Sequence, residues 1–189
     1  MSLYFIALLP HYTLREQVKA IKKEIEARYQ AKHALKLPAH ITLKMPFNIN
    51  KEEEPILIKS LQELADRIPV FDVELSGFDY FKSGVIFIKC ADHDPIIEIH
   101  NKLEQVFVQN LGIKKKEDPS RFYPHITIAS RDLSAEFFGK SLGEFKNREF
   151  HASFEAESFF LFKHNGKTWD VYRKFFFIPK VEIGKFEGK

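Results

Sequence analysis

The 189-residue sequence is poor in cysteine, with Cys90 alone, and it contains no long apolar segment. One cysteine cannot form an intrachain disulfide, and a structural zinc site would need further thiols or histidines, so we expect Cys90 to be a buried strand residue. The apolar run at residues 3–9 has no basic leader, and no segment approaches the roughly 18 apolar residues of a membrane span. These absences predict a soluble cytoplasmic protein that does not interact with membranes.

An excess of charge of one sign is also missing. The 29 Lys and Arg residues nearly balance 26 Asp and Glu residues, for a net charge of +3 and a pI near 8.8. This mild basicity suits an anionic substrate such as a phosphate ester, but it is too weak to indicate binding of duplex DNA. With 44% hydrophobic residues and 20 phenylalanines, the composition predicts a globular protein with an aromatic core.

Hydrophobic periodicity predicts helices and strands up to residue 178. In residues 13–30 apolar positions recur every three or four residues, Thr13 and Glu16 fit a capping box, and Asn165-Gly166 is a typical two-residue hairpin turn. The predicted helices are 13–30, 52–68, 94–112 and 134–145. The predicted strands are 3–9, 40–47, 71–81, 84–91, 121–129 and two long strands within 148–178 that join at 164–167.

The order of these elements repeats along the chain. Each half runs helix, His-x-Thr strand, helix and hairpin, and no low-complexity linker separates the halves. We therefore expect an α+β fold with two pseudo-symmetric lobes, each with an antiparallel sheet and helices, and an active-site cleft between them. Residues 1–178 would form this single bilobal domain, with exchange of terminal strands between lobes as an option, and residues 179–189 would form a C-terminal tail.

The most informative feature is a repeated motif, HITL at 40–43 and HITI at 125–128. With eight histidines and four threonines in the chain, chance would produce only about 0.2 His-x-Thr pairs, so two copies in matched surroundings exceed what chance explains. In a strand, residues two apart share a face, so each histidine lies beside its threonine while the aliphatic residues face a core. Lys44 would continue the first polar row, and Arg131 the second if its strand runs that far.

Two such rows are useful for cleaving a phosphodiester. Imidazole titrates near pH 6.5, so one of His40 and His125 can act as a neutral base while the other is a charged acid. The hydroxyls of Thr42 and Thr127, helped by Lys44 or Arg131, can donate hydrogen bonds to the phosphoryl oxygens. The competing interpretation is a pair of strand histidines that are hydrogen-bonded only for structure.

Aromatic residues near the predicted cleft are candidates for stacking on a nucleobase. We name Phe47 and Tyr123 as substrate-binding candidates, together with Lys44 and Arg131. Core packing is the alternative role for both aromatic residues. No histidine outside the two motifs has a matched partner, and we predict no metal site.

The segments LPAHITLKMPF and RFYPHITIASR resemble the paired H-x-[ST]-x signatures of the two-histidine (2H) phosphoesterase superfamily, which includes the so-called 2′,5′ RNA ligases and cyclic nucleotide phosphodiesterases. The resemblance spans about residues 3–178. It implies a bilobal α+β fold and metal-free chemistry, without a cofactor, on 2′,3′-cyclic or 2′–5′ phosphate linkages. The resemblance also implies roles for the residues of the two motifs: His40 and His125 would be the acid/base pair, and Thr42 and Thr127 would bind phosphate.

The expected function is therefore that of a metal-independent phosphoesterase acting on cyclic or 2′–5′ phosphodiesters of RNA or nucleotides. The expected partner is an RNA end or a small cyclic nucleotide, and the expected state is a monomer. Two alternatives stay open at this point: an RNA- or nucleotide-binding module without turnover, and a 2′–5′ RNA ligase that runs the same chemistry in reverse. The motifs do not say which histidine is the base.

Overall fold

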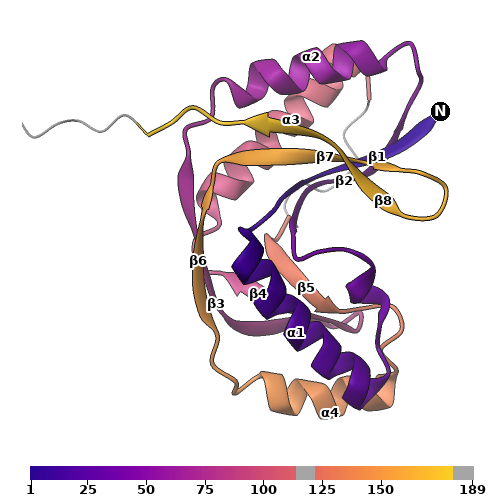
Figure 1. Cartoon of the computed structure of the whole chain (residues 1–189), viewed down its shortest axis with the longest axis vertical. Coiled ribbons are helices and arrows are strands. Elements are labelled where there is room, and N and C mark those ends of the chain that lie inside the picture. The colour runs from indigo at the N-terminus through magenta and orange to yellow at the C-terminus, as the bar shows by residue number, and fades with distance from the viewer. Residues whose placement is uncertain (114–121, 181–189) are drawn as a thin grey trace, which may run out of the picture.

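A computed structural model describes residues 1–113 and 122–180 of the chain (Figure 1). The helices are α1 (Tyr12–Tyr29), the short 3-10 helix η1 (His33–Lys36), α2 (Glu54–Ala65), α3 (Asp94–Leu111) and α4 (Ala135–Phe145). The strands are β1 (Ser2–Leu8), β2 (Ile41–Ile49), β3 (Phe71–Phe81), β4 (Val85–Cys90), β5 (His125–Ala129), β6 (His151–Ala156), β7 (Ser158–His164) and β8 (Trp169–Phe176). Each helix within the described residues is too short or too polar to span a bilayer.

The strands form one antiparallel sheet in the order β6-β3-β4-β5-β2-β1-β7-β8. Only Glu157 separates β6 from β7, yet five strands lie between them in this order. The sheet must therefore curl until its ends approach each other, and the chain runs directly from β6 into β7 along one side of the molecule (Figure 1). Of the two long strands predicted in 148–178, the first is wrong, because the chain leaves one part of the sheet at Glu157 and enters another as β7; the second is confirmed as β8, which pairs with β7.

Two lobes divide the sheet at the contact between β2 and β5. The β1 lobe contains β2, β1, β7 and β8 and is covered by α2 and α3, whereas the β4 lobe contains β5, β4, β3 and β6 and is covered by α1 and α4 (Figure 1). The expected α+β fold with two lobes is thus confirmed. However, α1 follows β1 and packs on the β4 lobe, while α3 follows β4 and packs on the β1 lobe. Each lobe therefore draws on both halves of the sequence, rather than on one half.

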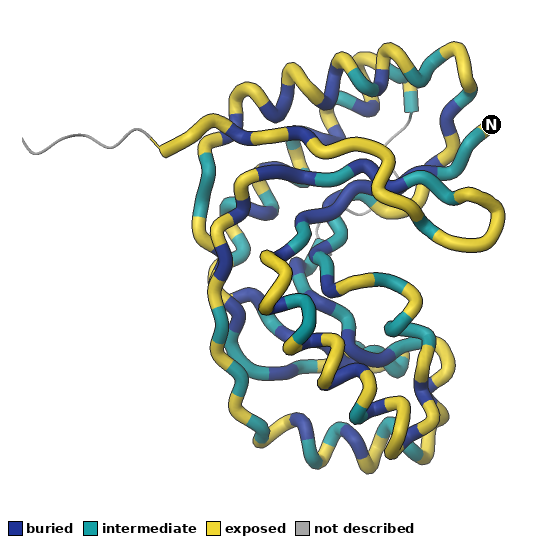
Figure 2. Tube along the Cα trace, viewed as in Figure 1, coloured by how far each residue is buried: buried dark blue, intermediate teal, exposed yellow. Residues whose placement is uncertain are grey.

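The aliphatic residues of the two motifs lie in the core, as predicted. Ile41, Leu43, Ile126 and Ile128 are all fully buried between the sheet and the helices. Figure 2 shows the same division along the chain, with buried strands inside and exposed outer faces on the helices. Cys90 is a buried residue of β4, also as predicted, and burial raises the pKa of its thiol to about 12, so it stays protonated at neutral pH.

The first helix begins differently from the expected capping box. Helix α1 starts at Tyr12, and the Nδ1 atom of His11 accepts a hydrogen bond of 3.3 Å from the backbone N–H of Leu14. Thr13 is therefore inside the first turn instead of capping it, and the prediction of a box with Glu16 is wrong. A histidine ring nitrogen can replace the usual hydroxyl or carboxylate because it offers the same lone pair.

The hairpin between β7 and β8 has a four-residue loop, 165–168, rather than the predicted two-residue turn. The side-chain oxygen of Asn165 accepts hydrogen bonds from the backbone N–H groups of Lys167 (2.9 Å) and Thr168 (2.8 Å). Gly166 supplies the positive φ of 97° that this turn needs. Asn165 and Gly166 thus form the turn that the sequence predicted, but the loop around them has four residues.

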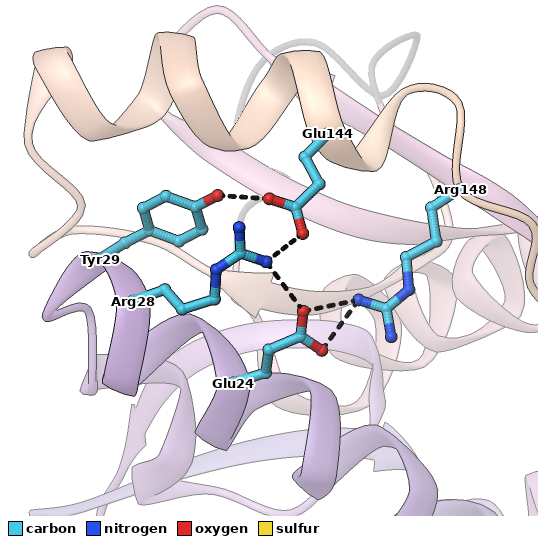
Figure 3. Close-up of polar contacts among 5 residues, drawn as sticks. All are labelled: Glu24, Arg28, Tyr29, Glu144 and Arg148. Carbon is cyan, nitrogen blue, oxygen red and sulfur yellow. Dashed lines mark hydrogen bonds and ion pairs between the residues drawn. The ribbon is translucent and has the colours of Figure 1, made fainter.

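A network of polar contacts joins α1 to α4 (Figure 3). Arg148 donates to both oxygens of Glu24, at 3.0 and 2.9 Å, and the hydroxyl of Tyr29 donates to Glu144 at 2.6 Å. Arg28 lies between the two carboxylates and contacts both of them. The network holds the last two turns of α1. The chain then continues into η1, whose residues line the cleft described below.

Glu54, at the start of α2, connects that helix to three strands. It accepts hydrogen bonds from the hydroxyls of Tyr172 and Tyr4 and pairs with Lys163 at 2.9 Å. These donors hold the pKa of Glu54 at about 2, against an ordinary value of 4.5. A depressed carboxyl pKa contributes stability that is present above about pH 4.5 and is lost as the pH falls toward 2.

We therefore expect Glu54→Gln to lower the free energy of unfolding at pH 7, and to lower it by a smaller amount at pH 3. Urea unfolding of both proteins at the two pH values measures this. Glu52→Gln, which removes an exposed carboxylate just before α2, serves as the control and should have little effect at either pH. An equal loss at pH 7 and pH 3 in Glu54→Gln would contradict the role of its charge.

Candidate active site

The two motifs meet at the centre of the sheet. Strands β2 and β5 pair through Ile41 and Ile126, which are the corresponding second residues of the two motifs. Because the strands are antiparallel and their side chains alternate, this register sets His40 opposite Thr127 and Thr42 opposite His125. Both histidines and both threonines then share the face that points away from the buried isoleucines. The local symmetry of the pair explains why the chain contains the same motif twice.

Both histidine rings are held in the same way. His40 Nδ1 lies 2.8 Å from the carbonyl oxygen of Pro38, and His125 Nδ1 lies 2.7 Å from that of Tyr123. A carbonyl can only accept, so each Nδ1 carries a proton, and Nε2 of each neutral ring has the free lone pair. Each imidazole is therefore oriented with one nitrogen able to take up a proton, or to donate it once the ring is charged.

Burial keeps both rings neutral in the free protein. The pKa of His40 falls to about 4, mainly through burial; the hydrogen bond to the Pro38 carbonyl opposes this shift, and the charge of the nearby Lys22 adds to it. Burial also lowers the pKa of His125, against the effect of the hydrogen bond to Tyr123. Since both values fall below the ordinary 6.5, either ring can act as a base near neutral pH, and the one that acts as an acid must first gain a proton.

A cleft of about 720 Å³ lies over this centre, and His40, Thr42 and Thr127 form part of its wall. The ring of His125 is not on that wall, because it packs against Phe81 and Phe87 with centroids 5.1 and 4.9 Å away. Of the described residues that line the cleft, none is acidic. The other lining residues are Leu3, Phe5, Lys22, His33, Ala34, Lys36, Leu37, Met45, Pro46, Ser130, Arg131, His164, Lys167, Thr168 and Trp169.

Lys44 does not continue the row of His40 and Thr42, and that expectation is wrong. On β1, the adjacent residues Ile6 and Ala7 face Lys44 and Thr42, so one extra residue is inserted in β2 between these partners. Such a bulge breaks the alternation, and Lys44 turns to the core face. Its Nζ atom pairs with Glu104 at 2.6 Å, and the two side chains are only 11% and 9% exposed.

Phe47 is buried in the core, so the expectation that it lines the cleft is also wrong. Its ring packs on Phe107 with centroids 4.6 Å apart. A second irregularity in the pairing with β1 lies between Lys44 and Phe47. It restores the alternation that the first one broke, and Phe47 shares the core face with Ile41.

The remaining two predicted binding residues lie on different sides of the histidine pair. Tyr123 is half-buried beside Phe87, with centroids 5.6 Å apart, on the His125 side. Strand β5 ends at Ala129, two residues before Arg131. The backbone of Arg131 itself is left-handed, with φ 58°, and this turn brings Arg131 to the wall of the cleft. Arg131 thus reaches the cleft through a turn rather than through an extended strand.

Several residues of the cleft were not among the candidates that the sequence indicated, above all Lys22. It is 3% exposed, and its Nζ atom donates a 3.1 Å hydrogen bond to the carbonyl of Leu37. Burial lowers its pKa to about 8. A signal was present in α1, since Lys22 lies four residues after Val18 in the series of buried positions and is the charged member of that series. No comparable signal marked His33, Lys36 or Trp169.

Comparisons with known proteins found one family model and several relatives that are similar to this chain. The family model described as the 2′-5′ RNA ligase superfamily matches residues 10–168. The protein named "Putative phosphoesterase BH1439" of Halalkalibacterium halodurans is 27% identical over 175 residues, which cover 91% of this chain and 95% of that protein. "Putative phosphoesterase OB1230" of Oceanobacillus iheyensis is 26% identical over 175 residues, or 91% and 96% of the two chains.

Solved structures share the fold. The crystal structure of TT0787 of Thermus thermophilus aligns with a TM-score of 0.67 and 23% identity, over 93% of this chain and 97% of that one. The crystal structure of E. coli LigT in apo form aligns with a TM-score of 0.67 and 17% identity, over the same shares. LigT has also been crystallised in complex with 3′-AMP, NADP+ and ATP.

Proposed function

The chain belongs to the 2′-5′ RNA ligase superfamily of two-histidine phosphoesterases, and on that premise we propose that it is a metal-independent enzyme that opens 2′,3′-cyclic phosphates or related cyclic or 2′–5′ phosphodiesters of RNA ends or nucleotides. One observation carries the proposal. The rings of His40 and His125 are each fixed through Nδ1 by a backbone carbonyl, on strands that meet at the centre of the sheet. Two rings with free Nε2 atoms are what a reaction with two proton transfers requires.

In this reaction a water oxygen attacks the phosphorus atom while one histidine takes the proton from the water. The bond from phosphorus to a ribose oxygen then breaks, and the second histidine gives that oxygen a proton. The product is a phosphate monoester, and the net change is the addition of one water molecule. The hydroxyls of Thr42 and Thr127, directly beside the rings on the same face, would donate to the phosphoryl oxygens as their charge grows.

We assign the base to His40 and the acid to His125. The pKa of His40 falls to about 4, and the neighbouring positive charge of Lys22 disfavours its charged form. His125 has no such cation among the groups that shift its pKa. The first proton that enters the pair therefore favours His125, which leaves His40 neutral and able to accept a proton from water.

A nucleotide substrate is supported by the aromatic part of the cleft. The indole of Trp169 packs edge-on against Phe5, with centroids 4.7 Å apart, and lies 4.9 Å from the ring of His164. It is half-buried on the cleft wall, so it can offer a stacking surface to a base. The complexes of LigT with 3′-AMP and ATP concern that protein, and they make nucleotides reasonable first ligands for this one.

The direct test is turnover in excess EDTA. The substrates are nucleoside 2′,3′-cyclic phosphates, an oligoribonucleotide with a 2′,3′-cyclic end, and a 2′–5′-linked dinucleotide, with phosphorus NMR to identify the monoester. We expect hydrolysis of at least one substrate, with a bell-shaped pH profile. Because the reactive form has one charged and one neutral ring, kcat/KM should be highest between about pH 4 and 6.5.

Other results would support other functions. Tight binding without turnover would favour a nucleotide-binding module, and joining of RNA ends at high substrate concentration would favour the ligase direction. Activity that is lost in EDTA and restored by a divalent metal would contradict the metal-independent mechanism. An optimum of kcat/KM well above pH 7 would contradict acid catalysis by a histidine with a lowered pKa.

A further inference from the structure

The cleft is chemically different on the two sides of the histidine pair. On one side, the 165–168 loop and the start of β8 bring the aromatic surface of Trp169 together with a single exposed cation, Lys167. On the other side, η1 and the turn after β5 bring His33, Lys36 and Arg131. No described residue on the cleft wall is acidic, so nothing on the wall itself compensates the positive charges of Lys36 and Arg131. The reaction at the histidine centre needs only one phosphate group, and it leaves this basic side unused.

The basic side is built by a specific contact rather than by a loose surface cluster. Asp132 accepts hydrogen bonds from the backbone N–H groups of Lys32 (2.9 Å) and His33 (2.8 Å), about 100 residues away in sequence. Its own N–H donates to the carbonyl of Ser130 at 2.6 Å, which closes the turn around Arg131. The carboxylate therefore holds η1 beside this turn, and the basic residues of both segments lie together.

The groups near His33 show the same proximity. Burial lowers the pKa of His33, and the charges of Arg131 and Lys36 lower it further, while Asp132 acts in the opposite direction. Lys36 and Arg131 are both exposed and line the cleft, and the described part of the chain gives neither of them an ion-pair partner. Two such cations at one end of a cleft without acidic residues form a suitable site for an anion.

We propose that Lys36 and Arg131 bind a second phosphate of the substrate, the one at the 5′ position of the nucleotide whose cyclic phosphate lies between the histidines. This inference rests on the proposed function and narrows its substrate class. The preferred substrate carries at least two phosphate groups, either as a 5′-phosphorylated cyclic nucleotide or as an RNA end, whose last internucleotide phosphate has the same position. A nucleoside cyclic monophosphate lacks this group and leaves the subsite empty.

Binding of stable product analogues tests the subsite without any turnover. Isothermal titration with adenosine 3′-monophosphate and adenosine 3′,5′-bisphosphate should give a Kd that is roughly 10 to 100 times lower for the bisphosphate, from two charge-assisted contacts. A dinucleotide with a 3′-terminal phosphate distinguishes the two sources. It should share the advantage if the subsite accepts the diester of an RNA end, and a preference for the bisphosphate alone assigns the subsite to a free 5′-phosphate.

The test variant is Lys36→Gln combined with Arg131→Asn. Both residues are exposed, and asparagine tolerates the left-handed backbone of residue 131, so folding should be preserved. The matched control is Lys59→Gln with Arg67→Asn, which removes the same charges from exposed positions of α2 and the segment after it. The test variant should bind both nucleotides with similar affinity, and the control should keep the wild-type preference for the bisphosphate.

The proposal is overturned if the wild-type protein shows no preference, if the test variant keeps it, or if the control loses it as well. Failure of the proposed function gives a different pattern. A bisphosphate preference that depends on Lys36 and Arg131, without opening of any cyclic phosphate, would leave the subsite standing and remove the reaction. Hydrolysis at equal kcat/KM with and without a 5′-phosphate would keep the reaction and remove the subsite.

Discussion

Replacing either His40 or His125 by alanine is expected to lower kcat for the opening of a cyclic phosphate by about 10²–10⁴-fold, because each variant removes one of two proton transfers. The fold should remain, since neither histidine belongs to the hydrophobic core and the buried isoleucines beside them are unchanged. Single-turnover kinetics on the best substrate of the panel, with circular dichroism to verify folding, measures the effect.

The assignment of acid and base predicts a difference between the two variants. A diester with a good leaving group, such as a nitrophenyl ester, needs little help from an acid. The His125→Ala variant should therefore keep more of the wild-type rate on that substrate than His40→Ala does. The opposite order would exchange the two roles.

An exposed histidine provides the control for these variants. His151, at the start of β6, is far from the motifs in the sheet order, and His151→Ala should retain wild-type kinetics. If either motif variant also retained wild-type rates, paired acid/base catalysis by His40 and His125 would be wrong.

Lys44→Ala is expected to reduce the free energy of unfolding by about 3 kcal/mol, because it leaves the carboxylate of Glu104 without its partner at a largely buried position. The ammonium group of Lys44 also lies over the ring of Phe107, with Nζ 4.7 Å from the ring centroid, and this cation–π contact is lost as well. At permissive temperature, kcat and KM should stay near their wild-type values, since the side chain points away from the cleft.

Chemical denaturation of the single and double variants measures this contribution. Replacing both charges together, as Lys44→Met with Glu104→Leu, should recover most of the lost stability, because no unpaired charge remains. If Lys44→Ala had a higher KM but unchanged stability, the structural role would be wrong. Lys44 would then bind substrate, as the sequence alone indicated.

The sequence was a reliable guide to the side-chain period within single elements, although not to the cap of α1 or the length of the loop between β7 and β8. The alternation in HITL and HITI predicted the buried Ile41 and Ile126, and the periodicity of residues 13–30 predicted helix α1 to within one residue at each end.

The two binding candidates on β2 failed for different reasons. The orientation of Lys44 depends on a bulge that arises when β2 pairs with β1, and the sequence of β2 contains no mark of the inserted residue. Phe47, by contrast, lies an even number of residues after Ile41, so simple alternation already favoured the core for it. Core packing, the alternative role given to this phenylalanine, is the one that the structure shows.

By itself, the sequence determined the two His-x-Thr faces, the aliphatic core behind them and the helical segments, because the period of side chains along a strand or helix is a local property. Only the tertiary structure decided which segments meet. Three contacts join residues that are far apart in the chain. Ile41 pairs with Ile126, and Asp132 accepts a hydrogen bond from the backbone of His33. Helices α1 and α3 each pack on the lobe that does not contain the strand before them. Such contacts follow from packing the whole molecule, and they make two separate motifs into one candidate site.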